Sequence, residues 1–305
     1  MNVGACLLVG SLVVAWLAPP LLERAGGRHD PFAVLLAWWA AIIAVISSFF
    51  IGVALLLVPE SGLHRWVELV AHHCWVAVSH GHLPAQHELI GIAATLTAVV
   101  LIVRTVASAV RQRRAQRASR EAHRDLLALL GRPRTPNTPS VLHVPHTTPM
   151  AYSIGGRDGL VVLSTGVEQL PRAQRAAVLS HEQAHLRGRH HLLVAAAEIL
   201  AAAMPWVPIT RRAPDAVRVL VELCADATAV RSCGAPAVRA ALIALAGSPG
   251  PAHALSMAGA DVPLRLYHLQ AGYRTRTAPT RLLLPLAAVA APALVAIVTA
   301  VTFCA

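Results

Sequence analysis

Two histidines and a glutamate in the segment 178–187 have the spacing of a metal-binding helix. His181 and His185 are four positions apart, so on an α-helix both imidazoles leave one face and can reach a single metal ion. Glu182 lies one position further round, where it can accept a proton from water at the metal. This His-Glu-x-x-His arrangement indicates two zinc ligands and a general base. Because two histidines also occur on ordinary helices, the surroundings must decide.

A third ligand is needed, since catalytic zinc takes three protein ligands and keeps one position open. Glu222 and Asp226 are also four apart, so one helix presents both to the same place. We expect Glu222 to bind zinc and Asp226 to hold the far ring nitrogen of a ligand histidine, with His181 as the expected partner. Glu198 is the weaker alternative, because it lacks an aspartate at that spacing and lies inside an apolar run.

The segment 171–188 carries the start and stop signals of a helix. Pro171 fits the first turn, where its missing N–H costs nothing, and Gly188 offers a stop. The residues on one stripe between them are Ala177, Val178, His181, Ala184 and His185. We therefore expect the histidines on the packed face of this helix.

Short strand signals precede that helix, at residues 141–144 and 150–154. A glycine-rich turn, 155–159, then leads into the apolar run 160–164, which predicts a hairpin beside the metal-binding helix. An edge strand there could hold a substrate peptide in extended form. A purely structural hairpin is the alternative.

The composition is that of a membrane protein. In 305 residues, 56% are hydrophobic and only 13% are charged, which is more apolar than an ordinary soluble domain. Arg104 falls in one of the apolar runs, near its end, from which its charge can reach the membrane surface. The first run lacks the basic start and the cleavage site of a signal peptide, so we expect a retained helix. The four runs, each meeting the requirement of ~20 residues for a span, are Val3–Leu22, Pro31–Val58, Leu89–Val110 and Leu282–Cys304.

Arginine positions predict the orientation of these spans in the cell membrane. Residues 59–88, between the second and third spans, contain one arginine and three glutamates. The positive-inside rule therefore places this loop and both termini outside and residues 111–281 in the cytoplasm, followed by the last span in 282–305. The three spans then belong to residues 1–110. The arginines that flank the other span ends are Arg24, Arg28, Arg111, Arg113, Arg114, Arg117, Arg120, Arg124, Arg274, Arg276 and Arg281.

The apolar run 192–209 raises a question of topology. If it crossed the membrane, His185 and Glu222 would lie on opposite sides and could not share a metal ion. The 36 residues between them suffice for a helix, a bend at Pro205-Trp206-Val207-Pro208 and a returning helix. We therefore predict that residues 192–230 form a helical hairpin that packs on the membrane, or dips into it, without crossing.

The external loop 59–88 is rich in histidine. A metal or pH sensor is one interpretation, and an interfacial amphipathic helix with tryptophan anchors is the one we favour. The five cysteines show no paired spacing, so no disulfide framework is expected. The histidines of this loop are His64, His72, His73, His80, His82 and His87.

The two motifs together are the pattern of glutamate-type zinc peptidases. With the strand 160–163 before them, the Pro-Trp-Val-Pro break between them and the layout of three spans before and one after, the chain resembles the BlaR/MecR-type membrane metallopeptidases. The segment 263–269 is similar to the arginine-containing segment of that family and of the more distant HtpX-like and CAAX prenyl proteases. The resemblance covers the layout of the whole chain but motifs only within about 120–270.

The resemblance implies a mainly α-helical, polytopic membrane protein whose cytoplasmic zinc-peptidase domain carries a small β-sheet. It implies Zn²⁺ bound by His181, His185 and Glu222, with Glu182 as base. A cation or hydrogen-bond donor should stabilise the oxyanion. Arg265 leads the candidates because of the resemblance, ahead of Tyr267 and His268, and a structural ion pair is the alternative for Arg265.

The chain departs from the β-lactam sensors of that family, which carry a penicillin-binding domain with a Ser-x-x-Lys nucleophile after the last span. It contains no lysine at all, so we expect no covalent β-lactam sensing by the chain itself. Three functions stay open: cleavage of a BlaI/MecI-like winged-helix repressor or of the protein itself in signal transduction, HtpX-like membrane-protein quality control, and a non-catalytic membrane sensor.

The expected partners follow from the same features. They are membrane lipid, a protein substrate and, as a candidate, a second copy of the chain. The net charge of +11 comes mostly from the arginines that flank the spans. We therefore expect it to serve membrane contact and not direct nucleic-acid binding.

Overall fold

The computed structural model describes residues 3–27, 29–57, 86–129, 140–156, 159–246, 255–256, 261–272 and 278–304. The histidine-rich external loop predicted for residues 59–88 lies outside the described residues up to residue 85. Its last three residues belong to a helix.

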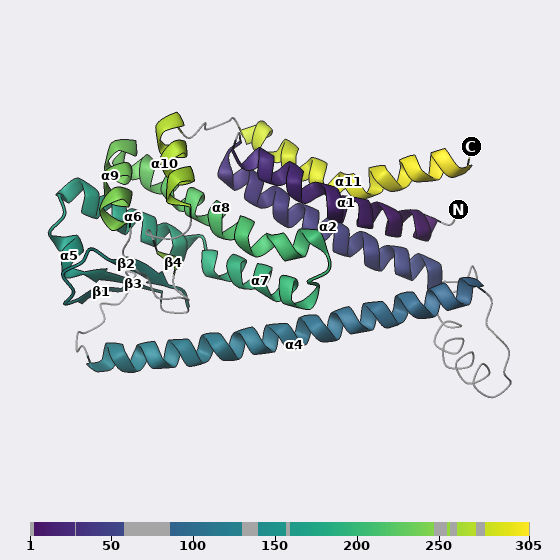
Figure 1. Cartoon of the computed structure of the whole chain (residues 1–305), viewed down its shortest axis with the longest axis horizontal. Helices are drawn as coiled ribbons and strands as arrows, with labels where there is room; N and C mark the ends of the chain where they lie inside the picture. The colour runs from purple at the N-terminus through teal and green to yellow at the C-terminus, as the bar shows by residue number, and fades with distance from the viewer. Residues whose placement is uncertain are drawn as a thin grey trace.

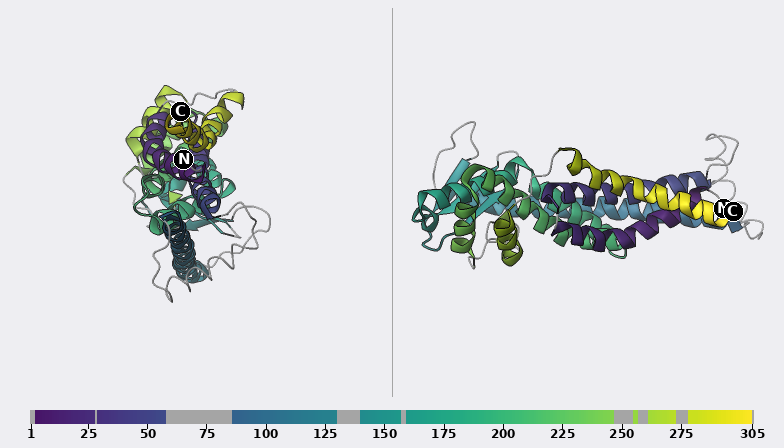
Figure 2. Two further views of the ribbon diagram at one scale, coloured as in Figure 1. Left: turned by 90° about the vertical axis from the view of Figure 1, so that its right-hand side faces the viewer. Right: turned by 90° about the horizontal axis from the view of Figure 1, so that it is seen from above.

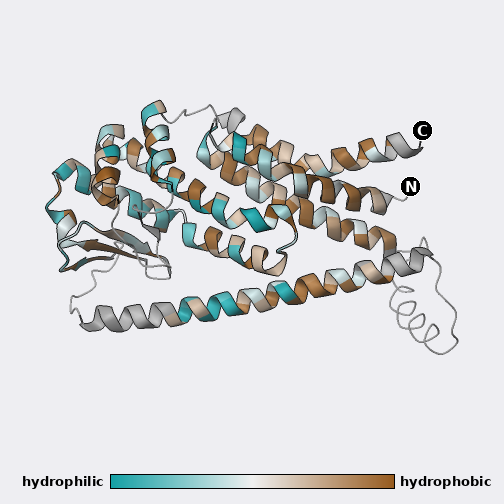
Figure 3. Ribbon diagram, viewed as in Figure 1, coloured by the Kyte–Doolittle hydropathy of each residue, from teal (hydrophilic) through white to brown (hydrophobic). Residues whose placement is uncertain are grey.

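Three long apolar helices form a bundle at the end of the molecule that holds both termini (Figure 1). They are α1 (Val3–Gly26), α2 (Pro31–Leu57) and α11 (Ala278–Cys304). A fourth, α4 (Gln86–Leu129), runs along one side of the molecule, apart from the other three in the end-on view of Figure 2. Each carries a stretch long and apolar enough to cross a membrane, so the chain is a multi-pass membrane protein with the four spans predicted. Figure 3 shows the apolar residues concentrated at this end.

Small residues let the helices of this bundle approach closely. A Cβ added to Gly4 would lie 2.7 Å from the carbonyl oxygen of Gly52, and one added to Gly10 would lie 2.5 Å from that of Pro292. Such contacts leave no room for any side chain. Because lipid tails are as apolar as leucine, close van der Waals packing of this kind replaces the hydrophobic effect in holding membrane helices together.

Helix α4 differs from the expectation in its length. The sequence predicts a span that ends at Val110, but the helix continues without a break to Leu129, over 44 residues in all. Residues 92–130 contain neither glycine nor proline, so no helix-breaking residue interrupts α4 between its apolar stretch and its polar end.

The predicted helical hairpin is present as α7 (His190–Ala203) and α8 (Pro208–Cys233), joined by the turn 204–207. Apolar residues of α8, including Ile209, Ala213 and Val217, join the core that contains Trp38 of α2. At the tip, the guanidinium of Arg104 donates hydrogen bonds to the carbonyl oxygens of Ala203 (2.8 Å) and Ala202 (3.2 Å).

The β-sheet lies at the opposite end of the molecule from the termini (Figure 1). Its strands are β1 (Ser140–Val144), β2 (Ala151–Ile154), β3 (Leu160–Ser164) and the two-residue β4 (Leu255–Ser256), in the order β1-β3-β2-β4. The predicted hairpin is the antiparallel pair β2–β3, with Ala151 opposite Leu163. The parallel pairing of β1 with β3 and the addition of β4 were not foreseen from the sequence.

Helices cover this sheet and form the second core. After the short α5 (Thr165–Glu168), helix α6 (Arg172–Arg187) packs against β2 and β3, and α9 (Ala235–Leu245) and α10 (Val262–Ala271) follow α8. Ala177 and Val178 of α6 are fully buried with Val161 of β3 and Leu242 of α9. Helix α8 belongs to both cores, because its first half packs on the membrane bundle and its second half on α6.

Candidate metal centre

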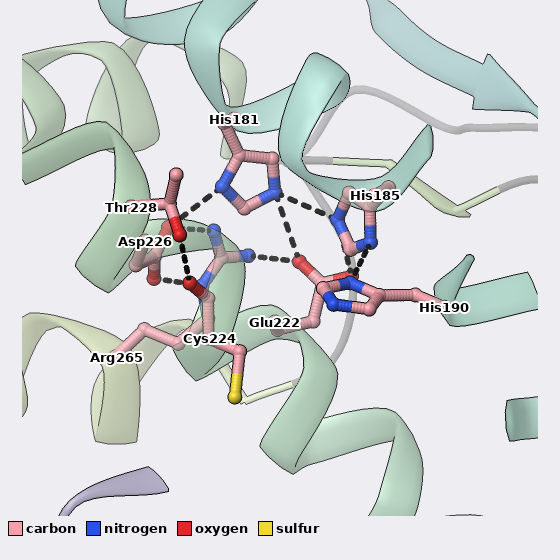
Figure 4. Close-up of polar contacts among 8 residues, drawn as sticks. All are labelled: His181, His185, His190, Glu222, Cys224, Asp226, Thr228 and Arg265. Carbon is pink, nitrogen blue, oxygen red and sulfur yellow. Dashed lines mark hydrogen bonds and ion pairs between the residues drawn. The ribbon is translucent and has the colours of Figure 1, made fainter. Parts of the chain in front are cut away.

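Helices α6 and α8 bring two histidines and a glutamate together in the interior (Figure 4). Helix α6 has the predicted bounds, with Pro171 and Gly188 as its caps, and His181 and His185 lie on its buried face. The Nε2 atoms of the two rings are 3.0 Å apart. The Glu222 carboxylate lies 3.3 Å from each of them, through Oε2 to His181 and Oε1 to His185.

This group fits a zinc ion. Zinc binds histidine nitrogen and carboxylate oxygen at about 2.0–2.1 Å in a tetrahedron, which places neighbouring ligand atoms about 3.3 Å apart. The observed separations of 3.0 and 3.3 Å match that spacing. His181, His185 and Glu222 are the one group of metal-binding side chains found among the described residues, and all three are buried.

Asp226 and Arg265 contact two of these ligands, His181 and Glu222. Oδ1 of Asp226 lies 2.9 Å from Nδ1 of His181, the ring nitrogen that faces away from the metal position. The guanidinium of Arg265 donates two hydrogen bonds of 2.7 Å to the Asp226 carboxylate and lies 3.0 Å from Oε2 of Glu222. Since Arg265 is fully buried and engaged with both carboxylates, the geometry supports the ion-pair interpretation of this residue, and a role at the oxyanion stays a prediction.

The electrostatics of the group favour a charged carboxylate at Asp226. Burial alone would raise the pKa of Asp226, but the charge and hydrogen bonds of Arg265, together with His181, lower it to about 2. Burial alone would lower the pKa of His181, but its bonds to Asp226 and Glu222 raise it to about 9. Burial and the neighbouring charges of His181, His190 and Arg265 keep the pKa of His185 well below its ordinary value.

A third histidine, His190, was missed by the sequence analysis. Its Nδ1 lies 2.9 Å from Nδ1 of His185, and both rings are buried. Burial, then the charges of His181 and His191, lower the pKa of His190 to about 4. Helical periodicity could not place this residue, because α6 ends before it and Arg189 takes a left-handed conformation with φ 49°. The sequence signal that could have indicated His190 is its position a few residues after the end of the metal-binding helix.

The remaining candidates are distributed as follows. Glu182 is fully buried on α6 between the two ligand histidines. Glu198 accepts hydrogen bonds from Gln112 and Arg218 and is not in the metal group, which agrees with its lower rank. Tyr267 is exposed and His268 is buried, both on α10 beside Arg265.

The fold and the site define the class of protein: a membrane-embedded zinc metallopeptidase, with a His-Glu-x-x-His helix and a glutamate ligand from a second helix. Residues 111–216 are similar to peptidase family M48, and the buried group of His181, His185 and Glu222 agrees with a zinc metallopeptidase. The match ends before Glu222, so it does not cover the third ligand, which is assigned from the geometry of the site. No curated protein and no solved structure matches the chain.

Proposed function

We propose that this enzyme is an endopeptidase of the cytoplasmic membrane face that acts in signal transduction by cleaving a cytoplasmic protein. A winged-helix repressor of the BlaI/MecI type, or the enzyme itself, is the proposed substrate. The observation that carries the proposal is that α8 belongs to the membrane core and to the metal site at once, so that bond cleavage takes place close to the bilayer.

The length of α8 limits how far the site stands from the membrane. Arg212 of α8 lies 3.4 Å from Glu23 at the end of the first span, and Glu222 follows ten residues later. At 1.5 Å per residue this separates the ligand from the bundle end by about 15 Å. A substrate must therefore bring its scissile bond to within about this distance of the bilayer surface.

The arginine distribution supports a cytoplasmic metal site with both termini outside. Arginines flank the inner ends proposed for all four spans, such as Arg24, Arg111 and Arg281. Labelling of single cysteines placed at position 175 and near the amino terminus, in intact cells, tests this. If an impermeant reagent labelled position 175, the orientation would be the reverse of the one proposed.

The proposed mechanism assigns roles to residues of the chain. Bound zinc supplies Lewis-acid polarisation of the scissile carbonyl and an acidic water. Glu182 takes the proton of the attacking water and passes it to the leaving amine. Asp226 holds the proton on Nδ1 of His181 and keeps that ring turned to the metal, while Arg265 fixes the two carboxylates, Glu222 and Asp226, that come from α8.

A second candidate function, quality control of membrane proteins, is favoured by the family match. The M48 family includes HtpX-like and Ste24-like proteases, and the match does not extend to the BlaR-like subtype. The position of the site near the bilayer suits both functions, because tails and loops of other membrane proteins reach this zone as readily as a repressor does.

The activity is tested by replacing Glu182 with Gln in the full-length protein. We expect zinc to stay bound and proteolysis, including self-cleavage, to be abolished, since the amide cannot accept the proton. The matched control is Glu168→Gln on α5, an exposed glutamate outside the metal group. Undiminished proteolysis by Glu182→Gln would contradict the mechanism.

Proteomics separates the two functions. In cells that carry Glu182→Gln, one stabilised regulator is expected for signal transduction, and many stabilised membrane proteins are expected for quality control. A proteome identical to that of cells with the Glu168→Gln control would oppose both.

A further inference from the structure

We propose that His190 is a positioning residue of the metal site, which fixes the ring of His185 by accepting a hydrogen bond from its Nδ1. This inference concerns the metal ligands alone, so it does not depend on which protein the enzyme cleaves.

The two rings are held in one arrangement. Nδ1 of His190 lies 2.9 Å from Nδ1 of His185, and the ring planes are nearly perpendicular, with centroids 4.9 Å apart. His185 is 1% and His190 7% exposed, so water does not compete freely for the bond. The opposite nitrogen of His185, Nε2, faces Glu222 and His181 (Figure 4).

The direction of the hydrogen bond follows from the metal. A histidine that binds through Nε2 has no proton there and must carry its proton on Nδ1. Nδ1 of His185 is therefore the donor and Nδ1 of His190 the acceptor, which places the His190 proton on Nε2. Metal-binding histidines in general use their second nitrogen in this way, and the partner fixes both tautomer and ring orientation.

The His190 ring packs directly against the backbone at Gly188. A Cβ added to Gly188 would lie 2.3 Å from Nε2 and 2.6 Å from Cδ2 of that ring. Gly188 itself has φ −75° and ψ −4°, values open to any residue, so glycine is required there by the ring and not by the backbone. The left-handed turn at Arg189 then brings the next residue back toward the site.

The two ligand histidines therefore have different partners: a carboxylate for His181 and a neutral ring for His185. Three carboxyl groups, of Glu182, Glu222 and Asp226, already lie in the buried group, against Arg265 and the charge of a divalent ion. A further carboxylate at position 190 would leave an unbalanced buried charge. A neutral acceptor orients His185 without adding one, and so leaves the metal more electrophilic.

The test compares two substitutions in the full-length protein in detergent, with the zinc dissociation constant measured by competition with a chelator. His190→Asn keeps an acceptor close to the place of Nδ1 but loses volume, whereas His190→Leu keeps volume but has no acceptor. We expect His190→Leu to weaken zinc binding by about 10- to 100-fold and His190→Asn to retain most of the affinity. The control, His146→Leu, changes an exposed histidine outside the metal group and should leave it unchanged.

A packing role predicts the opposite order. Zinc binding by His190→Leu as tight as by His190→Asn, or tighter, would overturn the proposal.

A second experiment holds even if His190→Leu does not fold. Gly188→Ala should push the ring away and weaken zinc binding, and the same change in a His190→Ala background should have no further effect, because the two residues act through one contact. An equal loss of affinity in both backgrounds would overturn the proposal.

Discussion

The core around the metal site buries Glu182, Glu222, Asp226 and Arg265, whereas the core shared by α1, α2 and α8 is built from aliphatic side chains around Trp38. In the core around the metal site, Arg265, Asp226 and Glu222 meet charged partners at defined distances, such as 2.7 Å between Arg265 and Asp226. In the membrane core, helix backbones approach closely at glycines, and these van der Waals contacts have no preferred direction.

The difference lies in what a substitution does to each core. A buried charge that loses its partner keeps the whole cost of its removal from water, while a glycine that gains a methyl group only forces two helices apart. Substitutions in the metal core should therefore weaken zinc binding. Substitutions in the membrane core should lower the free energy of unfolding alone. Helix α8 passes through both cores, so a displacement of the membrane core could be transmitted along it to the metal site.

The largest effect is expected for Arg265→Leu. The change would leave the carboxylates of Asp226 and Glu222 buried without the guanidinium. Breaking a buried ion pair in this way costs about 3–5 kcal/mol. The free energy of unfolding of the zinc-loaded protein in detergent measures this. The double variant Arg265→Leu/Asp226→Leu should be less destabilised than the single one, because the Asp226 carboxylate is no longer left buried without its partner. If the single variant were as stable as the wild type, the ion-pair interpretation would be wrong.

Next comes Asp226→Asn, which removes the charge behind His181. We expect the zinc dissociation constant to rise about 10- to 100-fold, measured by chelator competition. Asp215→Asn, also on α8 but 91% exposed, is the matched control and should not change it. Equal zinc affinity of the two variants would show that the carboxylate does not act on the metal.

A smaller effect on stability is expected for Gly10→Ala. Its new Cβ would lie 2.5 Å from the Pro292 carbonyl oxygen, so α1 and α11 must separate, at about 1–3 kcal/mol for overpacking. Gly26→Ala, on the same helix with nothing within 4 Å of its Cβ, is the control. The zinc dissociation constant should be unchanged in both. A loss of zinc affinity in Gly10→Ala would mean that the membrane core transmits strain to the site.

Much of this comparison could be predicted from sequence. A spacing of four predicted the His181/His185 pair and the Glu222/Asp226 pair, and the apolar runs predicted the four spans, because each signal is local to one helix. The Pro-Trp-Val-Pro segment predicted the turn of the hairpin, because proline is favoured at the first position of a helix, where Pro208 begins α8.

What sequence did not give depends on contacts between elements. The pairing of Arg265 with Asp226 joins residues 39 positions apart, and an arginine has no pattern that names its partner. The parallel strand β1 and the short β4 are fixed by neighbours in the sheet. His190 lies beyond a helix end, where periodicity carries no information.

The smallest effect is expected where a polar contact enters the apolar region. Arg104 lies within the third span and donates to the carbonyl oxygens of Ala202 and Ala203. These belong to the last turn of α7, which lacks helical partners for such groups. Its guanidinium also lies 5.0 Å from the ring centroid of Trp206.

Arg104→Gln should cost about 1 kcal/mol, since hydrogen bonds between membrane helices average about 0.6 kcal/mol each. The zinc dissociation constant should stay the same. The control is Arg111→Gln, whose side chain bonds within its own helix to Ser108. If the two variants unfold with the same free energy, α4 is held to the hairpin by packing alone. A clear difference would instead show that one directed bond, of the kind that builds the metal core, also fastens the hairpin tip to the third span.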